Sequence, residues 1–406
     1  MPRPSLRFTV PFCQLASDFD RAEMPNTSRE NIMRRLRLPI LAAVVMICLT
    51  FVVLAVIEGA ASLALFARSI YGAHLAEEHF TERDTLLGWI SAPNTSKPNM
   101  FGAGKSLNIN AQRFRHSGDV TPVPTAGKKR VVCSGDSFTL GYGVDDTRTW
   151  CALLASNEPS LETVNMGQGG YGIDQAYLWY VRDGIPLRPQ VHVFSIIHDD
   201  FFRMVGDRFL GFPKPTLALD SGGRLRTVGV PVPNPGLGPF RERLLKNVRS
   251  LRAFQLLEAL SSEARRSSPS PTSATWDVAR VIFQDLAARD SGIGAKFVVV
   301  YLPTLDQFKG HASDKWRQRI REAAATDRYE FVDLVPDLRR LAPDSVDRLF
   351  IPPGELGFFG AAGHFTDAGN VWVERLLRER IPELDGATPS PRAKRSAADS
   401  TSAPRE

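Results

Sequence analysis

The sequence predicts an α/β fold with an N-terminal transmembrane helix: a three-layer α/β/α sandwich around a parallel, flavodoxin-like sheet of about five strands. Short segments rich in Val, Ile and Phe alternate with helical segments along much of the chain. Strands that are buried on both faces have such apolar runs, and their alternation with helices is typical of a parallel sheet. We expect the strands at residues 130–134, 162–165, 191–197, 296–302 and 329–333.

Helices are expected between most of these strands. In one of them, Val278, Ile282 and Leu286 recur every four residues, which places them on one face. Such a face can pack against the sheet while the opposite face contacts water. We expect the helices at residues 175–183, 276–288, 315–325 and 368–380.

The N-terminal apolar run predicts a transmembrane anchor within residues 34–60. No residue from Leu38 to Ile57 is charged, and at about 1.5 Å per residue this run spans about 30 Å, the thickness of the hydrocarbon core of a bilayer. Arginines at 34, 35 and 37 place a flexible tail, residues 1–33, in the cytoplasm and the rest of the chain outside. A cleaved signal peptide is the alternative, although the run is longer than a usual signal sequence.

The rest of the chain divides into a leader, one large domain and a tail. We expect the leader to begin as a helix that runs to about Phe80 and to be irregular over residues 84–115. A proline-rich segment in the large domain, which also has a helical pattern at Leu244, Val248 and Leu251, predicts an insertion that forms a lid or substrate wall. The expected boundaries are 61–127 for the leader and linker, 128–385 for the domain with its insertion at about 203–271, and 386–406 for a disordered tail.

Composition narrows the classes of function. The formal charge of +6 is concentrated near the two ends of the chain, without a basic stripe interleaved with aromatic residues, so nucleic-acid binding is not expected. The four cysteines, Cys13, Cys48, Cys133 and Cys151, lack the spacing of metal ligands. We interpret them as isolated thiols, with a Cys133–Cys151 bridge as the alternative. No metal and no organic cofactor is expected.

Four polar clusters follow or flank predicted strands, where parallel strands of a sheet collect catalytic groups. They are Gly135-Asp136-Ser137, the glycine-rich run 165–172, His198-Asp199-Asp200, and the segment 363–370, which contains His364. Each also has an ordinary interpretation, namely a surface turn, a flexible connector, a solvated loop end and a capping histidine. A serine at a sharp strand end can act as a nucleophile with its own N–H directed at the oxyanion.

Taken in this order, the clusters resemble the motifs of the SGNH hydrolases, also called the GDSL family, over roughly residues 130 to 380. The resemblance implies that Ser137 is the nucleophile and His364 the general base. It also implies an oxyanion hole formed by the N–H groups of Ser137 and Gly167 and by position 199. The leader and insertion are similar to a membrane-anchored bacterial subgroup linked to cell-surface polysaccharide.

Two positions depart from the family pattern. Ala361 stands where the family usually has an aspartate that orients the histidine. His364 would then act in a Ser–His dyad, or be oriented by a backbone carbonyl or by a carboxylate from elsewhere, of which Glu355 is the nearest in sequence. Asp199 stands where the family has an asparagine. An ionised carboxylate accepts hydrogen bonds and cannot donate one to an oxyanion. Both departures favour a slow or specialised enzyme.

The resemblance implies a serine esterase, an O-acyl hydrolase or acyltransferase, that acts on acyl esters, most simply acetyl esters, of an extracytoplasmic glycan. It would be a single-pass protein of the bacterial inner membrane with its domain in the periplasm, and its partner would be a membrane acyltransferase or a polysaccharide-assembly protein. The alternative is a catalytically weakened glycan-binding or scaffold subunit. A further option is a lipid-directed esterase, because the anchor holds the domain near the membrane.

Overall fold

The parallel sheet that the apolar runs predict is present. The computed structural model describes residues 26–72, 80–236, 240 and 270–385, and within them five parallel strands form one sheet in the order β13-β12-β7-β5-β6. Each strand lies within a few residues of its expected position. The strands are β5 (Lys129–Gly135), β6 (Leu161–Gly167), β7 (Val191–Ile196), β12 (Lys296–Tyr301) and β13 (Glu330–Asp333).

The order of the strands places the end of β5 at a special position. Strand β6 pairs with one side of β5, and β7 pairs with the other side. The chain therefore crosses from one side of β5 to the other after β6, and this makes the carboxyl end of β5 a topological switch point. Ligands of open α/β sheets bind at such points.

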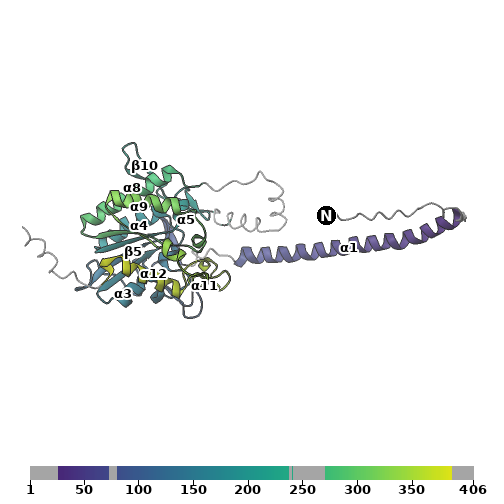
Figure 1. The fold of residues 1–406 in the computed structure, drawn as a ribbon, viewed down its shortest axis with the longest axis horizontal. Coiled ribbons are helices and arrows are strands. Elements are labelled where there is room, and N and C mark those ends of the chain that lie inside the picture. The colour runs from purple at the N-terminus through teal and green to yellow at the C-terminus, as the bar shows by residue number, and fades with distance from the viewer. Residues whose placement is uncertain (1–25, 73–79, 237–239, 241–269, 386–406) are drawn as a thin grey trace, which may run out of the picture. The chain divides into compact units, whose positions relative to one another are not determined.

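Helices cover both faces of the sheet (Figure 1). On one face Val132 and Val299 pack with α4, α8 and α9, and on the other Val131 and Val298 pack with α3 and α12. This alternation buries both faces and confirms the three-layer arrangement. The helices are α1 (Asn26–Gly72), α2 (Ser137–Leu140), α3 (Trp150–Asn157), α4 (Ile173–Trp179), α5 (His198–Arg203), α8 (Ser273–Gly292), α9 (Asp314–Asp327), α10 (Val335–Arg339), α11 (Pro343–Asp347) and α12 (Asp367–Arg380).

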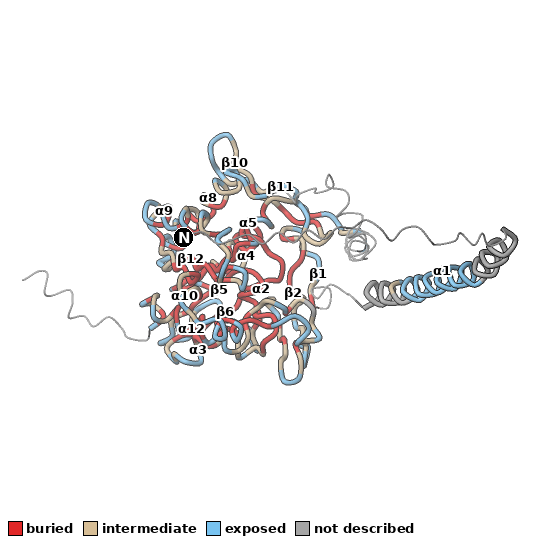
Figure 2. The backbone as a smooth tube through the Cα atoms, turned by 45° about the vertical axis from the view of Figure 1, so that its right-hand side comes forward, coloured by how far each residue is buried: buried red, intermediate tan, exposed pale blue. Residues whose placement is uncertain are grey.

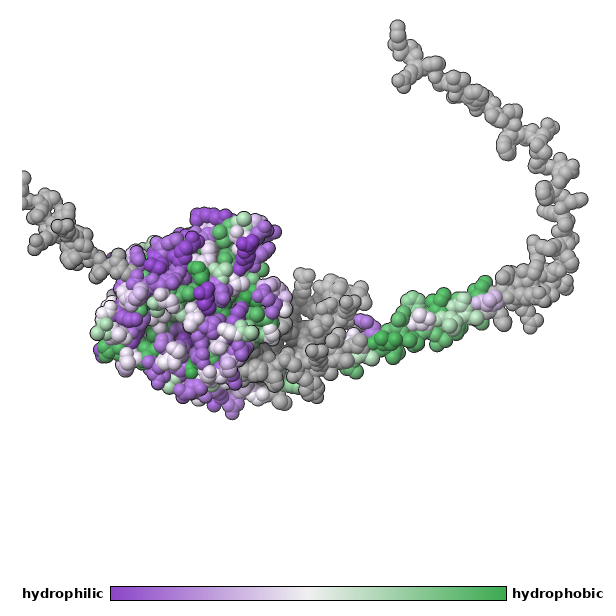
Figure 3. Space-filling view, turned by 90° about the horizontal axis from the view of Figure 1, so that it is seen from below, coloured by the Kyte–Doolittle hydropathy of each residue, from purple (hydrophilic) through white to green (hydrophobic). Residues whose placement is uncertain are grey.

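Helix α1 contains the predicted membrane span. Residues Pro39–Ala60 have a mean hydropathy of 3.2, and none of them is buried. Figure 3 shows hydrophobic surface along this helix. The helix is long and apolar enough to cross a bilayer. It begins at Asn26 and ends at Gly72, whereas we expected a flexible segment up to residue 33 and a helix up to about Phe80.

The leader is more regular than expected. Residues 84–115 were predicted to be irregular, but this region contributes to two antiparallel hairpins with apolar side chains buried against the domain. The prediction was wrong because these strands are three or four residues long, and contacts with distant parts of the chain hold them in place. The strands are β1 (Thr81–Asp84), β2 (Gly88–Ser91), β3 (Thr95–Lys97) and β4 (Leu107–Ile109).

The insertion also contains two hairpins, β8–β9 and β10–β11. The tip of the second is exposed, while the central sheet is buried (Figure 2). The helical pattern expected around Leu244, Val248 and Leu251 lies outside the described residues, as do the tails at 1–25 and 386–406. The strands are β8 (Arg208–Phe209), β9 (Phe212–Pro213), β10 (Thr216–Leu219) and β11 (Leu225–Val228).

Candidate active site

The end of β5 presents Ser137 at the switch point. The Asp136 side chain accepts a hydrogen bond from the Phe138 N–H (2.9 Å) and caps the short helix α2, of which Ser137 is the first residue. A Cβ atom at Gly135 would lie 2.4 Å from Thr139 Oγ1 and 2.5 Å from Ser195 Oγ. Glycine is therefore required for the chain to turn this sharply out of the sheet.

Ser137 and His364 are 227 residues apart in sequence and meet in the structure. His364 Nε2 lies 2.8 Å from Ser137 Oγ, within hydrogen-bond distance. The imidazole packs against the rings of Phe138 and Tyr142, with centroids at 4.4 and 5.1 Å. This is the geometry that a nucleophile and its general base require.

The second ring nitrogen of His364, Nδ1, has no carboxylate partner among the described residues. Nδ1 is buried and makes no hydrogen bond of normal length and angle within the described residues, although the Ala361 and Ala362 carbonyls lie near enough to interact with the ring. Ala361 is buried, and Glu355, the carboxylate that we considered as its replacement, is exposed. The pKa of His364 is lowered to about 4, first by burial and then by the positive charge of Arg203, while the carbonyls of Ala361 and Ala362 act in the opposite direction.

This lowered pKa predicts an unusual pH profile. The base acts in its neutral form, which persists at any pH well above the pKa of about 4. We expect kcat/KM for an activated ester to stay level from neutrality to about pH 5 and to fall about tenfold per unit below about pH 4. Rates measured across this range, with folding checked by circular dichroism at each pH, test the expectation. A midpoint near the ordinary histidine value of 6.5 would contradict it.

The Gly167 N–H is not free, contrary to the sequence-based expectation. It donates to Asn165 Oδ1 at 2.9 Å, while Asn165 Nδ2 donates to the Thr139 carbonyl at 2.8 Å. A Cβ atom at Gly167 would lie 2.0 Å from Leu140 N, so glycine is needed there for close packing against α2. In this structure Gly167 allows the end of β6 to pack closely against α2.

Two other N–H groups remain available near the nucleophile. Within the described residues, neither the Ser137 N–H nor the Gly170 N–H donates a hydrogen bond. Gly170 has a positive φ of 76°, and a Cβ atom there would lie 2.4 Å from the Phe209 ring. Sequence reasoning flagged the glycine run but had no basis for choosing Gly170 over Gly167, because the choice depends on which N–H the Asn165 side chain binds.

Asp199 is exposed on α5, whereas Asp200 is buried. Asp200 accepts from the Ile197 N–H at 2.9 Å and so caps the helix from within. A contribution of Asp199 to an oxyanion hole stays a prediction. Its exposure is what is expected of an ionised carboxylate that faces water.

Arg203, the last residue of α5, contacts the residue that follows β5, the 167–171 loop and its own helix. Its Nη1 lies 3.0 Å from Asp136 Oδ2, 2.7 Å from Asp200 Oδ1 and 3.0 Å from the Tyr171 carbonyl. Burial raises the pKa values of both aspartates, and Arg203 opposes the change. Sequence reasoning missed this arginine because its partners come from β5, the 167–171 loop and α5.

A second Ser–His–Asp set lies three residues upstream of the nucleophile. Ser134 Oγ is 2.7 Å from His192 Nε2, and His192 Nδ1 is 2.7 Å from Asp290 Oδ2. Tyr180 stacks on His192 at 3.4 Å and donates to Asp290. All of these side chains are buried in the core, so a substrate cannot reach Ser134. The only sign of this network in the sequence is a histidine inside an apolar strand.

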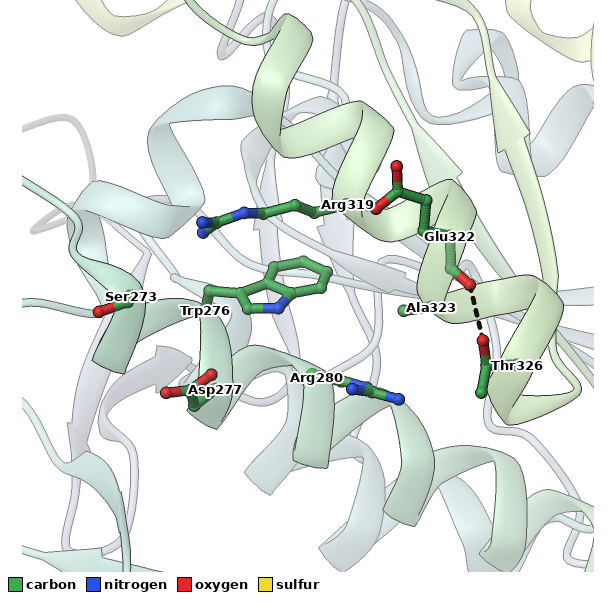
Figure 4. A pocket seen from close by; sticks show the side chains of 8 residues that line it. All are labelled: Ser273, Trp276, Asp277, Arg280, Arg319, Glu322, Ala323 and Thr326. Carbon is green, nitrogen blue, oxygen red and sulfur yellow. Dashed lines mark hydrogen bonds between the residues drawn. The ribbon is translucent and has the colours of Figure 1, made fainter.

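Other candidate features lie apart from Ser137. A depression of about 320 Å³ lies between α8 and α9, and Arg319 lies over the Trp276 ring, 5.9 Å from its centroid. Figure 4 shows the side chains that line it. Neither Ser137 nor His364 lines it. In the described part of the chain Cys133 and Cys151 are free thiols, and His, Cys, Asp and Glu form no group of three that could hold a metal.

Comparison with known proteins gives structural matches. The chain matches no protein-family model and no curated protein. Solved structures that resemble it include an acetyl xylan esterase, AlAXEase (13% identity, TM-score 0.37), and a GDSL-like lipase from Bacteroides thetaiotaomicron (14%, 0.32). A third is a catalytic mutant of Axe2, an acetylxylan esterase from Geobacillus stearothermophilus (12%, 0.35).

These matches cover part of this chain and nearly all of each matched chain. They span 62%, 64% and 63% of this chain and 99%, 91% and 96% of the three matched chains, respectively. At such identities and TM-scores the matches assign no residue role to this chain. The roles of individual residues in this chain therefore rest on its own geometry.

Proposed function

We propose that the protein is a membrane-anchored serine esterase of the SGNH type, which hydrolyses or transfers acyl groups. The observation that carries this proposal is the 2.8 Å contact between Ser137 Oγ and His364 Nε2 at the end of β5. The motif order in the sequence supports the same assignment. The unpaired N–H groups of Ser137 and Gly170 supply donors of the kind that stabilise an oxyanion.

The reaction begins when Ser137 Oγ attacks the ester carbonyl and His364 Nε2 takes the hydroxyl proton. The N–H groups of Ser137 and Gly170 donate to the resulting oxyanion. When the C–O bond to the leaving alcohol breaks, His364 returns the proton to that alcohol, and an acyl-Ser137 ester remains. Water or a second hydroxyl then attacks this ester while His364 takes its proton. The bond between the acyl carbon and Ser137 Oγ breaks, and His364 returns the proton to Oγ. Water as acceptor gives hydrolysis, and a sugar hydroxyl gives transfer.

We propose an acylated extracytoplasmic glycan as the substrate, with acetyl as the simplest acyl group. The sequence resemblance to the polysaccharide-linked subgroup supports this class of substrate. The apolar span Pro39–Ala60 and the arginines before it support an inner-membrane location with the domain on the periplasmic side. A polysaccharide-assembly protein or a membrane acyltransferase is the proposed partner.

Acetate release tests the proposed function. The full chain in detergent is incubated with an O-acetylated oligosaccharide, and acetate and transferred acetyl groups are quantified for wild type and His364→Ala. We expect release or transfer by wild type and a loss of about 10³-fold or more in the variant. Equal rates for the two proteins would contradict the proposal. A preference for long acyl chains would favour action on lipid instead.

A second candidate function is a glycan-binding or scaffold subunit, which the absence of a carboxylate partner for His364 Nδ1 among the described residues favours. Without a carboxylate partner the imidazolium is less stabilised, and a base with a pKa of about 4 abstracts a proton weakly. This alternative predicts glycan binding that is equal in wild type and Ser137→Ala, with no acyl-enzyme in either. Mass spectrometry during turnover distinguishes the two.

A further inference from the structure

We infer that the hairpin β1–β2, which follows the membrane helix in sequence, positions the oxyanion donors of the active site, with Trp89 as its principal positioning residue. The inference rests on the proposed function, because it assigns a task to the loop that carries the Gly170 N–H. We call residues Gly167–Tyr171 the oxyanion loop. Only residues 73–80 separate the end of α1 from β1.

Trp89 holds the oxyanion loop on both sides of Gly170. Its indole Nε1–H donates to the Gly169 carbonyl at 2.9 Å, and its own carbonyl accepts from Tyr171 Oη at 2.5 Å. The Trp89 and Tyr171 rings also pack edge to face, with centroids 5.7 Å apart. Trp89 and Tyr171 are both buried, so water cannot easily replace these bonds. The two residues that flank Gly170 are thereby hydrogen-bonded to one residue of the hairpin, Gly169 to the Trp89 side chain and Tyr171 to the Trp89 backbone.

The same hairpin holds the start of the loop. The N–H and the Oγ–H of Ser91 both donate to Gln168 Oε1 at 2.8 Å, and all of these groups are buried. Just after the loop, Gln175 Nε2 donates to the Leu87 carbonyl at 2.7 Å. The hairpin therefore contacts the loop at three of its five residues and contacts the following helix as well.

Phe209 of the insertion packs against both Trp89 and Gly170. Its ring stacks on Trp89 (centroids 6.0 Å apart, planes at 25°) and leaves no room for a Cβ atom at Gly170. The Arg203 guanidinium lies over the Phe209 ring, 5.5 Å from its centroid, and donates to the Tyr171 carbonyl. Gly170 is thus surrounded by groups that hold its neighbours, while its own N–H stays unpaired.

These contacts are suited to holding the Gly170 N–H in one direction. An oxyanion donor stabilises charge well only when its direction is fixed before the reaction, and a displacement of about 1 Å can lower a rate about 100-fold. The oxyanion loop contains three glycines, which have the greatest backbone freedom. Bonds from a neighbouring hairpin to the residues beside Gly170 restrict that freedom.

Trp89→Phe tests the inference in the full chain, because it keeps an aromatic ring and removes the N–H donor. We expect kcat for an activated ester, and the rate constant for labelling by a fluorophosphonate probe, to fall about 10- to 100-fold. KM and the number of sites finally labelled should stay near wild type. Ser91→Ala should act in the same direction with a smaller loss, and it provides the test if Trp89→Phe does not fold. Trp276→Phe, on α8, is the matched control and should label at the wild-type rate.

The outcomes separate the inference from the proposed function. Wild-type labelling rates in both Trp89→Phe and Ser91→Ala would overturn the inference alone. A reduced number of labelled sites with an unchanged rate constant per site would also overturn it, since that result indicates a purely structural role. Absence of labelling at Ser137 in the wild-type protein would overturn the proposed function instead.

Discussion

Replacing Ser137 with alanine is expected to lower the turnover of an acyl ester by about 10⁴- to 10⁶-fold. The substitution removes the Oγ atom that lies 2.8 Å from His364 Nε2, so no covalent acyl intermediate can form. The fold should be unaffected, because alanine is small and is a good helix former at the first position of α2. Initial rates with an aryl acetate, measured beside a thermal unfolding curve, test both parts.

The buried Ser134 provides a control within the same strand. Ser134→Ala should keep turnover within a few-fold of wild type and lower the free energy of unfolding by about 1–3 kcal/mol, because His192 Nε2 loses its buried partner. The pair of variants thus separates two Ser–His contacts of nearly equal length by their accessibility. Loss of turnover in Ser134→Ala with full activity in Ser137→Ala would reverse our assignment of the nucleophile.

Replacing Lys214 with methionine is expected to cause a large loss of stability. Lys214 Nζ lies 2.6 Å from Asp174 Oδ2, and both side chains are fully buried. Lys214 also donates to the Pro215 carbonyl at 2.9 Å. Removing one partner leaves a buried carboxylate without its counter-charge, which typically costs about 3–5 kcal/mol. Urea unfolding of both proteins at neutral pH measures the difference.

A double variant shows whether the unpaired charge causes this loss. Lys214→Met combined with Asp174→Asn removes both charges while keeping similar volumes, and we expect it to recover part of the stability lost in the single variant. A change below about 1 kcal/mol in Lys214→Met would contradict the buried ion pair. It would indicate that water reaches Asp174 in solution.

The sheet could be predicted from sequence because its strands are buried on both faces. β5, β7 and β12 consist almost entirely of buried residues, which leaves short apolar runs that are easy to recognise. The leader could not be predicted in this way. Its strands have no apolar run of their own, and Trp89 is held by Gly169, 80 residues away in sequence.

The contact between Ser137 and His364 could likewise be predicted, because each lies in a recognisable turn next to an element. The groups that surround Ser137 and His364 could not be predicted from the sequence. Whether Gly167 or Gly170 offers a free N–H depends on the direction of the Asn165 side chain. The contacts of Arg203 with Asp136 and the Tyr171 carbonyl join parts of the chain that meet only after folding. The expectation that the Gly167 N–H is free was wrong for this reason.

The measurement that tests the account most directly is intact-mass analysis after incubation with a fluorophosphonate probe. The full chain in detergent is compared with Ser137→Ala and His364→Ala under the same conditions. We expect one probe adduct on wild type, none on Ser137→Ala, and labelling slowed at least about 100-fold in His364→Ala. Absence of an adduct on folded wild-type protein, or an equal adduct on Ser137→Ala, would contradict the central claim that His364 activates Ser137 as a nucleophile.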